Sequence, residues 1–64
     1  MIVYVYDKDD ILHLIPNAFG ITYHKEQNEI TILYEDRRDS DHVTFNMHDV
    51  NLLAIEESYN ESAD

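Results

Sequence analysis

The sequence contains no cysteine and no tryptophan, and it has only one glycine and one proline among its 64 residues. Without cysteine, the chain has no disulfide, no cysteine-based zinc site and no thiol nucleophile. A single glycine also excludes a glycine-rich phosphate loop and a dinucleotide-binding fingerprint. We therefore expect stability to come from a compact sheet core alone, or from such a core extended by an interface with a second copy.

Basic residues are also scarce, since four lysines and arginines face 14 acids and leave a net charge of −10. Nucleic-acid-binding proteins need a basic surface, so direct binding to nucleic acid is not expected. Anionic lipid surfaces are disfavoured for the same reason. A field of this sign attracts cationic proteins and raises the rate at which they associate. The charge therefore predicts a basic protein as the partner, without contact to nucleic acid or membrane.

Long hydrophobic runs are absent as well. The first apolar run, residues 2–6, is short and follows no basic segment, so it does not resemble a signal peptide. A membrane helix needs about 20 apolar residues, far more than any run in this chain. We expect one small domain in the cytoplasm, which buries only about 60% of its unfolded surface.

Apolar residues recur mostly with a period of two, which favours strands over helices. Residues 2–6 are β-branched or aromatic after Met1 and are apolar on both faces, as in a central strand. Because they alternate, Tyr4 and Tyr6 share one face and Val3 and Val5 share the other. If the valines face the core, the tyrosines lie near the surface. The predicted strands span residues 2–6, 11–15, 18–24, 29–34, 42–47 and 52–56.

Residues in and near the connections between these strands predict turns and a bulge. Residues 25–28 form a predicted hairpin loop in which Asn28 takes a positive φ. Gly20 lies inside a predicted strand, which indicates a bulge or a close backbone approach. Residues 48–51 suit a single helical or 3₁₀ turn, and residues 52–56 suit either a strand or a short helix.

These elements predict an all-β fold with one short helical turn at most. A small antiparallel meander must cover its apolar face, so it curls into a barrel or half-sandwich, or stacks on a second copy as a homodimer. We expect a single β domain over residues 1–57 and a flexible acidic tail over 58–64. Aromatic residues are expected to fill the core, each contributing about 1.5–3 kcal/mol. They lie at positions 4, 6, 19, 23, 34 and 45.

The segment YEDRRDSDH, residues 34–42, holds both arginines of the chain, Arg37 and Arg38, among carboxylates. It has three interpretations. As a plain hairpin loop, it forms exposed ion pairs worth about 0–1 kcal/mol each. As a recognition loop, it directs Arg37 and Arg38 at a partner's carboxylates or uses them to orient the neighbouring acids.

As a metal loop, the same segment offers the carboxylates of Asp36, Asp39 and Asp41 to calcium or magnesium. A calcium-binding loop of the EF-hand type needs a glycine at its sixth position and a glutamate at its twelfth, and neither stands in register here. We therefore expect no metal site and no cofactor.

Groups suited to catalysis are few. No serine lies in a nucleophile motif, and paired carboxylates for glycoside chemistry need a cleft that a small sheet hardly offers. The histidines lack the spacing of paired metal ligands, and they stand at positions 13, 24, 42 and 48. We expect no enzymatic activity. Protonation of the histidines near pH ~6 reduces the negative charge, so association should depend on pH.

In its size, acidity, lack of cysteine and sheet-rich pattern, the whole chain resembles the small acidic proteins that bacteriophages and mobile elements encode to inhibit host nucleases, repair enzymes or polymerase. The resemblance rests on no specific motif. It implies an inhibitor that acts in the host cytoplasm as a DNA mimic, with carboxylates standing where phosphates would stand.

The charge and the alternation, rather than the resemblance, supply the predicted partner-binding residues, which are Glu35, Asp36, Arg37, Arg38, Asp39, Asp41, Tyr4 and Tyr6. The alternative function is a self-assembling structural or accessory module without an inhibitory role. A partner for one specific protein, in the manner of an antitoxin, is a third interpretation.

Overall fold

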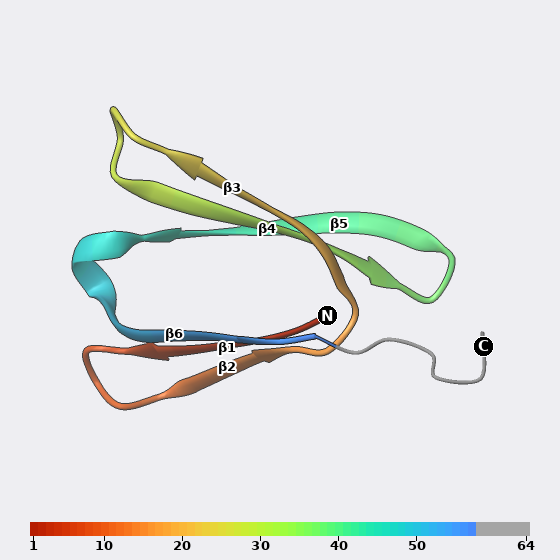
Figure 1. The fold of residues 1–64 in the computed structure, drawn as a ribbon, viewed down its shortest axis with the longest axis horizontal. Coiled ribbons are helices and arrows are strands. Elements are labelled where there is room, and N and C mark those ends of the chain that lie inside the picture. Colours follow the sequence, from red (N-terminus) through yellow and green to blue (C-terminus); the bar gives the residue numbers. More distant parts are fainter. Residues whose placement is uncertain (58–64) are drawn as a thin grey trace.

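A computed structural model describes residues 1–57 as two antiparallel sheets of three strands each. The first sheet has the order β2-β1-β6 and contains β1 (Ile2–Asp7), β2 (Leu12–Ile15) and β6 (Val50–Glu56). The second has the order β3-β4-β5 and contains β3 (Ala18–His24), β4 (Glu29–Asp36) and β5 (Asp39–Asn46). The predicted all-β fold is confirmed, as two facing sheets that do not close into a barrel (Figure 1). The tail predicted at 58–64 lies outside the described residues.

The chain changes sheets twice. It leaves the first sheet through Pro16 and Asn17, between β2 and β3, and it returns through the 3₁₀ turn η1 (Met47–Asp49). The side chain of Asn46 caps this turn by accepting a hydrogen bond from the backbone N–H of His48 at 2.9 Å. Strand β6 then pairs with β1, so the two ends of the described chain lie side by side in one sheet (Figure 1).

The structure decides two predictions about residues 48–56. The single helical turn predicted at 48–51 is confirmed and lies at Met47–Asp49. The segment predicted as either strand or helix, 52–56, lies within the strand β6. Strand β1 is the central strand of its sheet, as its two apolar faces indicate.

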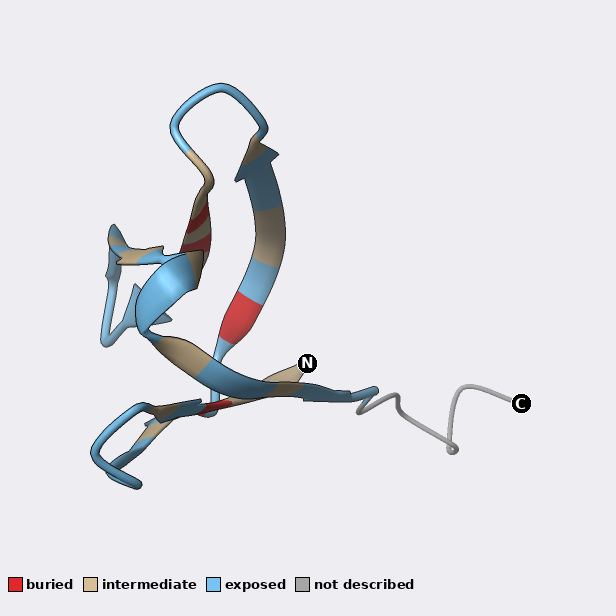
Figure 2. Cartoon of the chain, turned by 90° about the vertical axis from the view of Figure 1, so that its left-hand side faces the viewer, coloured by how far each residue is buried: buried red, intermediate tan, exposed pale blue. Residues whose placement is uncertain are grey.

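The core between the sheets is aliphatic. Val3 and Val5 of β1 and Ile32 of β4 are fully buried, and their strands are the central ones of the two sheets. Buried positions occupy only short stretches of the ribbon (Figure 2). The full set of buried residues is Val3, Val5, Ile15, Ala18, Ile30 and Ile32.

The expectation that aromatic residues fill this core is wrong. Phe19 and Tyr23 lie on the edge strand β3 and remain 53% and 55% exposed. Tyr34 and Phe45 pack only against the margin of the core. Each sheet has one central strand, so the fully enclosed space is narrow and holds short branched side chains, while larger rings lie at the edges.

Both predicted backbone features are confirmed. Asn28 has a φ of 55° at the end of the β3–β4 loop. The pairing of β3 with β4 shifts register between Ala18 and Gly20, which leaves Phe19 as the additional residue of a bulge. A Cβ atom on Gly20 would lie 3.1 Å from Cδ1 of Leu33, so the glycine leaves room for the Leu33 side chain.

The long charged loop predicted at 34–42 is not present. Strand β4 continues to Asp36, and β5 already begins at Asp39, so only Arg37 and Arg38 form the turn. The charged side chains do not end the strands, because both faces of this part of the hairpin are open to solvent and the ladder needs only a short turn. The segment predicted as a long recognition loop is therefore the tip of a hairpin with a two-residue turn.

Candidate functional site

The β4–β5 hairpin gathers three of the predicted acids on one face. Asp36 lies directly opposite Asp39 in the ladder, and Tyr34 lies opposite Asp41. Directly paired residues share a face, as do residues two apart along a strand, so Asp36, Asp39 and Asp41 lie on the same side. We call these three the hairpin carboxylates. Glu35, which pairs with Ser40, lies on the other side.

Two features of the hairpin tip destabilise it locally. Like charges placed directly opposite each other in a ladder are destabilising, and this is the arrangement of Asp36 and Asp39. Arg37 has a φ of 61°, a left-handed conformation that costs a non-glycine residue about 1–2 kcal/mol. All residues from Glu35 to Asp41 are exposed, so the carboxylates face solvent.

The arginines do not neutralise these carboxylates. Within residues 1–57, neither Arg37 nor Arg38 lies within ion-pair distance of an acid, so the local pairs expected for a plain solvated loop do not form. The ion pairs that occur there are Lys8–Asp49 at 3.2 Å, His13–Asp7 at 2.9 Å and His42–Asp41 at 4.0 Å. Both guanidinium groups therefore remain available for groups outside this part of the chain.

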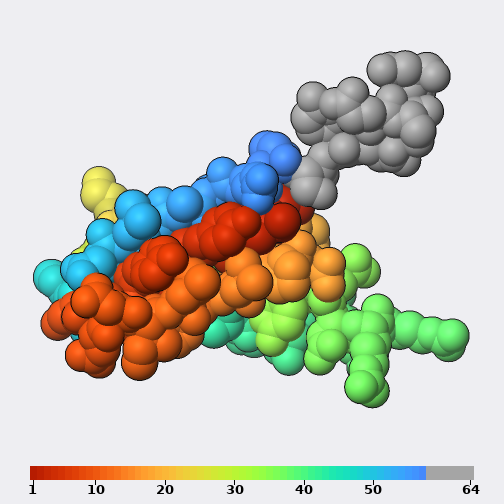
Figure 3. All heavy atoms as spheres, turned by 90° about the horizontal axis from the view of Figure 1, so that it is seen from below, coloured from red at the N-terminus to blue at the C-terminus, as the bar shows by residue number. Residues whose placement is uncertain are grey.

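The hairpin is anchored close to its turn. The backbone N–H of Glu35 donates a hydrogen bond of 3.0 Å to the carbonyl of Asn17, which ties β4 to the connection between the two sheets. Seen from the side of the first sheet, the region around the β4–β5 turn projects from one end of the molecule (Figure 3). The turn thus projects just beyond the point at which β4 is tied to the rest of the molecule.

The two predicted tyrosines lie on the outer face of the first sheet. Tyr4 pairs with Leu14 of β2 and with Ala54 of β6, and Tyr6 pairs with Leu12 and Leu52 in the same manner. These residues form a continuous apolar surface, which we call the tyrosine face; its members are Tyr4, Tyr6, Leu12, Leu14, Leu52 and Ala54. The prediction that burial of Val3 and Val5 leaves the tyrosines near the surface is confirmed.

The tyrosine face ends in carboxylates. The hydroxyl of Tyr4 donates a hydrogen bond of 2.8 Å to Oε1 of Glu56, and this bond to a carboxylate raises the pKa of Tyr4 above its ordinary value. Glu56 is thereby held beside the end of the face where β6 finishes. At the opposite end, the β1–β2 turn carries Asp9 and Asp10.

The structure does not bring all predicted binding residues together, because the hairpin carboxylates belong to the second sheet and the tyrosines to the first. The residues missed from the sequence are Leu12, Leu14 and Leu52. Alternation within residues 11–15 indicates that Leu12 and Leu14 share a face, but it does not show which strand lies beside them.

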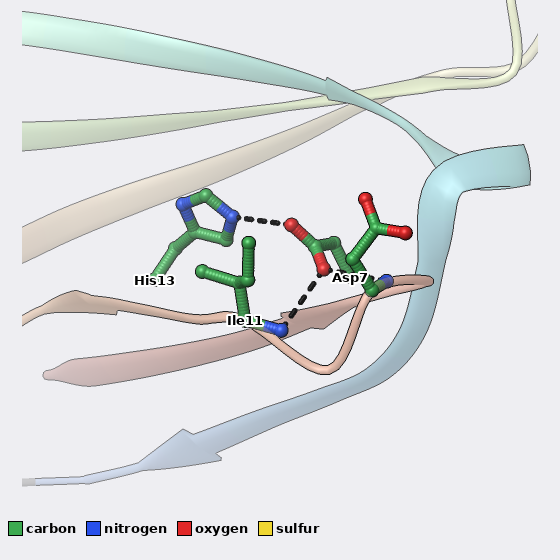
Figure 4. Close-up of polar contacts among 4 residues, drawn as sticks. Asp7, Ile11 and His13 are labelled. Carbon is green, nitrogen blue, oxygen red and sulfur yellow. Dashed lines mark hydrogen bonds and ion pairs between the residues drawn. The ribbon is translucent and has the colours of Figure 1, made fainter.

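A second polar cluster lies at the turn between β1 and β2 (Figure 4). Oδ1 of Asp7 accepts hydrogen bonds from the backbone N–H groups of Asp9 at 2.8 Å and Ile11 at 3.0 Å. Oδ2 accepts from Nε2 of His13 at 2.9 Å. The bond from His13, and then that from Ile11, lowers the pKa of Asp7 below its ordinary value. The His13 ring also meets the Phe45 ring edge-on, with centroids 5.2 Å apart.

A hollow of about 400 Å³ opens beside the edge strands β2 and β5. It is lined by His13, Leu14, Ile15, Pro16, Tyr34, Val43 and Phe45. Residues 1–57 contain no group of three histidine or acidic side chains arranged to hold a metal ion.

In the part of the chain that the structure describes, no helix has the length and apolar character needed to cross a bilayer. Comparison with known proteins gave no match among family models, curated proteins or solved structures. The function therefore has to be argued from the chemistry of the two surfaces.

Proposed function

We propose that the protein is an acidic binding module that engages a basic, nucleic-acid-binding surface of another protein and thereby inhibits it. The observation that carries the proposal is the uncompensated negative charge. No charged side chain is buried among residues 1–57, and Lys8 is the only lysine or arginine there that forms an ion pair. Most of the remaining carboxylates in this part of the chain are exposed, and they attract cations.

The hairpin carboxylates suit contact with a phosphate-binding surface. Asp39 and Asp41 lie about 6–7 Å apart along β5, and Asp36 lies opposite Asp39 at about 5 Å. Lysine and arginine side chains that hold a nucleic-acid backbone therefore meet several carboxylates at once on this rigid hairpin. The displaced counterions favour binding, as they do for DNA itself. The guanidinium groups of Arg37 and Arg38, which pair with no acid within residues 1–57, give the tip a means of fixing orientation on acids of the partner.

A charge-reversal experiment tests the proposal. The double variant Asp36→Lys/Asp39→Lys is compared with Glu26→Lys/Glu29→Lys, which makes the same change in net charge at the opposite end of the same sheet. Each tagged protein captures partners from a lysate at about 50 mM salt, and mass spectrometry identifies them. Circular dichroism verifies that each variant retains its sheets.

The proposal predicts that the wild type and the Glu26/Glu29 variant retain a basic protein and that the Asp36/Asp39 variant loses most of it. If the wild type retains no basic protein at this salt concentration, the proposed function is wrong. If the Asp36/Asp39 variant binds as well as the wild type, the hairpin tip is not the interface.

Self-assembly is the second candidate function, and the exposed tyrosine face is the observation that favours it. Sedimentation distinguishes the two functions. A dimer that persists in high salt and binds no basic protein supports a self-assembling module, whereas a monomer that captures a basic protein supports the acidic binding module.

A further inference from the structure

The tyrosine face is an apolar sheet surface with nothing on it in the described chain. Its two central positions are Tyr4 and Tyr6, and Leu14 and Leu52, beside them on the flanking strands, are 53% and 54% exposed. A sheet normally covers such a face with another layer, and contiguous exposed apolar patches of this kind mark interaction sites. Figure 3 shows the three strands of this sheet lying side by side on the surface.

The size of the face limits the kind of partner that can cover it. Three strands spaced about 4.8 Å apart and some five residues long give a footprint of roughly 14 by 17 Å.

The charges around the face disfavour the stacking of two copies. Asp9 and Asp10 lie at one end, and Glu56 and Glu57 lie at the other. When two copies stack with their strands aligned, acids meet acids at both ends, whether the copies run parallel or antiparallel. A partner that is apolar in the middle and cationic at both ends avoids this repulsion and instead gains attraction.

We propose that the tyrosine face binds an amphipathic helix of a partner protein, with the helix lying along the strands and carrying lysine or arginine at both of its ends. A helix of about 12 residues is about 18 Å long and 10–12 Å wide, which matches the footprint of the face. Its apolar stripe contacts Tyr6, Leu14 and Leu52, and its cationic ends reach the two groups of carboxylates.

The Tyr4–Glu56 hydrogen bond assists this arrangement. With its Oε1 atom held at 2.8 Å by the Tyr4 hydroxyl, the Glu56 carboxylate is already positioned at the edge of the face. A cation at that end of the helix therefore meets an acid that does not have to be ordered on binding. The inference rests on the proposed function, because it names the part of a basic partner that this face contacts.

The test uses a designed helical peptide as the probe. The peptide has about 16 residues, with leucines on one face and lysines at both ends, and a matched peptide carries glutamate in place of each lysine. Binding of each to the full ¹⁵N-labelled chain is followed by NMR. We expect the lysine peptide to shift the amide signals of β1, β2 and β6 and the glutamate peptide to shift none.

Two variants with the same change of charge complete the test. Leu14→Glu lies on the tyrosine face, and Phe19→Glu lies on the other sheet at the same 53% exposure. Each added carboxylate attracts the lysine peptide, so weaker binding can arise only from lost apolar contact. We expect Leu14→Glu to weaken binding at least about tenfold and Phe19→Glu to leave it unchanged.

Three results overturn the inference. The first is binding of the lysine peptide at the hairpin tip alone with equal affinity for both variants, which leaves the proposed function intact. The second is absence of binding at low salt while the wild type still captures a basic protein by its hairpin. The third is a dimer of the free protein that Leu14→Glu dissociates and Phe19→Glu does not, which would assign the face to a second copy.

Discussion

The carboxylate of Asp7 accepts a hydrogen bond from the imidazole of His13 at 2.9 Å, and the same imidazole packs edge-on against Phe45 in the other sheet. Asp7 also accepts hydrogen bonds from the backbone of the turn that joins β1 to β2. One ionised side chain thus orders the turn and places the ring that contacts the second sheet. These hydrogen bonds stabilise the ionised form, which lowers the pKa of Asp7 from its ordinary value of 3.8.

Acid stability should follow from this lowered pKa. A carboxylate whose pKa is lower in the folded protein contributes stability that is present above pH 3.8 and is lost as the pH falls through the folded-state pKa. We therefore expect Asp7→Asn to be less stable than the wild type at neutral pH and the difference to shrink below pH 3.8. Urea unfolding at several pH values measures this difference. Asp9→Asn, in the same turn, is the control, because the hydrogen bond of Asp9 to Asp7 comes from its backbone, and it should leave the stability at neutral pH closer to that of the wild type.

Replacement of Arg37, whose backbone is in the left-handed conformation, by glycine should stabilise the protein. Arg37→Gly relieves the cost of a positive φ, and we expect a gain of about 1 kcal/mol in the free energy of unfolding. Arg38→Gly makes the same change in charge at a residue whose φ is negative, so it should give no gain. Urea denaturation measures the free energy of unfolding of both variants. Equal changes for the two would show that the backbone of Arg37 is not strained.

Because the core is aliphatic, a small change at a buried isoleucine should destabilise the protein more than the loss of a whole aromatic ring at the edge. Ile32→Val removes one methylene group from a fully buried residue and should cost about 0.5–1.5 kcal/mol of stability. Phe19→Ser removes a whole ring that is 53% exposed and should change stability less, by about 0.5 kcal/mol. Thermal or urea unfolding compares the two. A larger loss of stability for Phe19→Ser than for Ile32→Val would contradict the aliphatic core and support the aromatic core that the sequence predicts.

The Tyr4–Glu56 hydrogen bond should be visible in the ionisation of tyrosine. Because Glu56 holds the phenol in its neutral form, Tyr4 should ionise above its ordinary pKa of 10.0. Glu56→Ala removes the acceptor, so the pKa of Tyr4 should fall towards 10.0. Ultraviolet absorbance or NMR titration of the tyrosines measures the shift. Glu57→Ala is the matched control, and an identical titration of both variants would contradict the contact.

Much of the strand pattern could be predicted from the sequence because alternation is local. The strand at residues 2–6, the positive φ of Asn28 and the bulge at Gly20 all depend on residues close together in the chain. The predicted strands of the β4–β5 hairpin are too short, because a run of charged residues indicates a loop. In the structure, Asp36 and Asp39 continue the ladder on a surface that is open to solvent.

The candidate surfaces were harder to predict, since they depend on pairing between distant strands. Tyr6 faces Leu52 across more than forty residues of sequence, and only the return of β6 to β1 creates the apolar surface they share. The clustering of Asp36, Asp39 and Asp41 on one face likewise follows from the register of the hairpin, which depends on the length of its turn.

The central claim is that the exposed carboxylates bind a cationic protein surface in the manner of nucleic acid. The most direct test is the affinity for the captured partner, measured as salt rises from about 50 to about 200 mM. We expect the logarithm of affinity to fall linearly with the logarithm of salt concentration and the slope to be smaller for the Asp36→Lys/Asp39→Lys variant. An affinity that does not change over this range, or that rises, would contradict the claim.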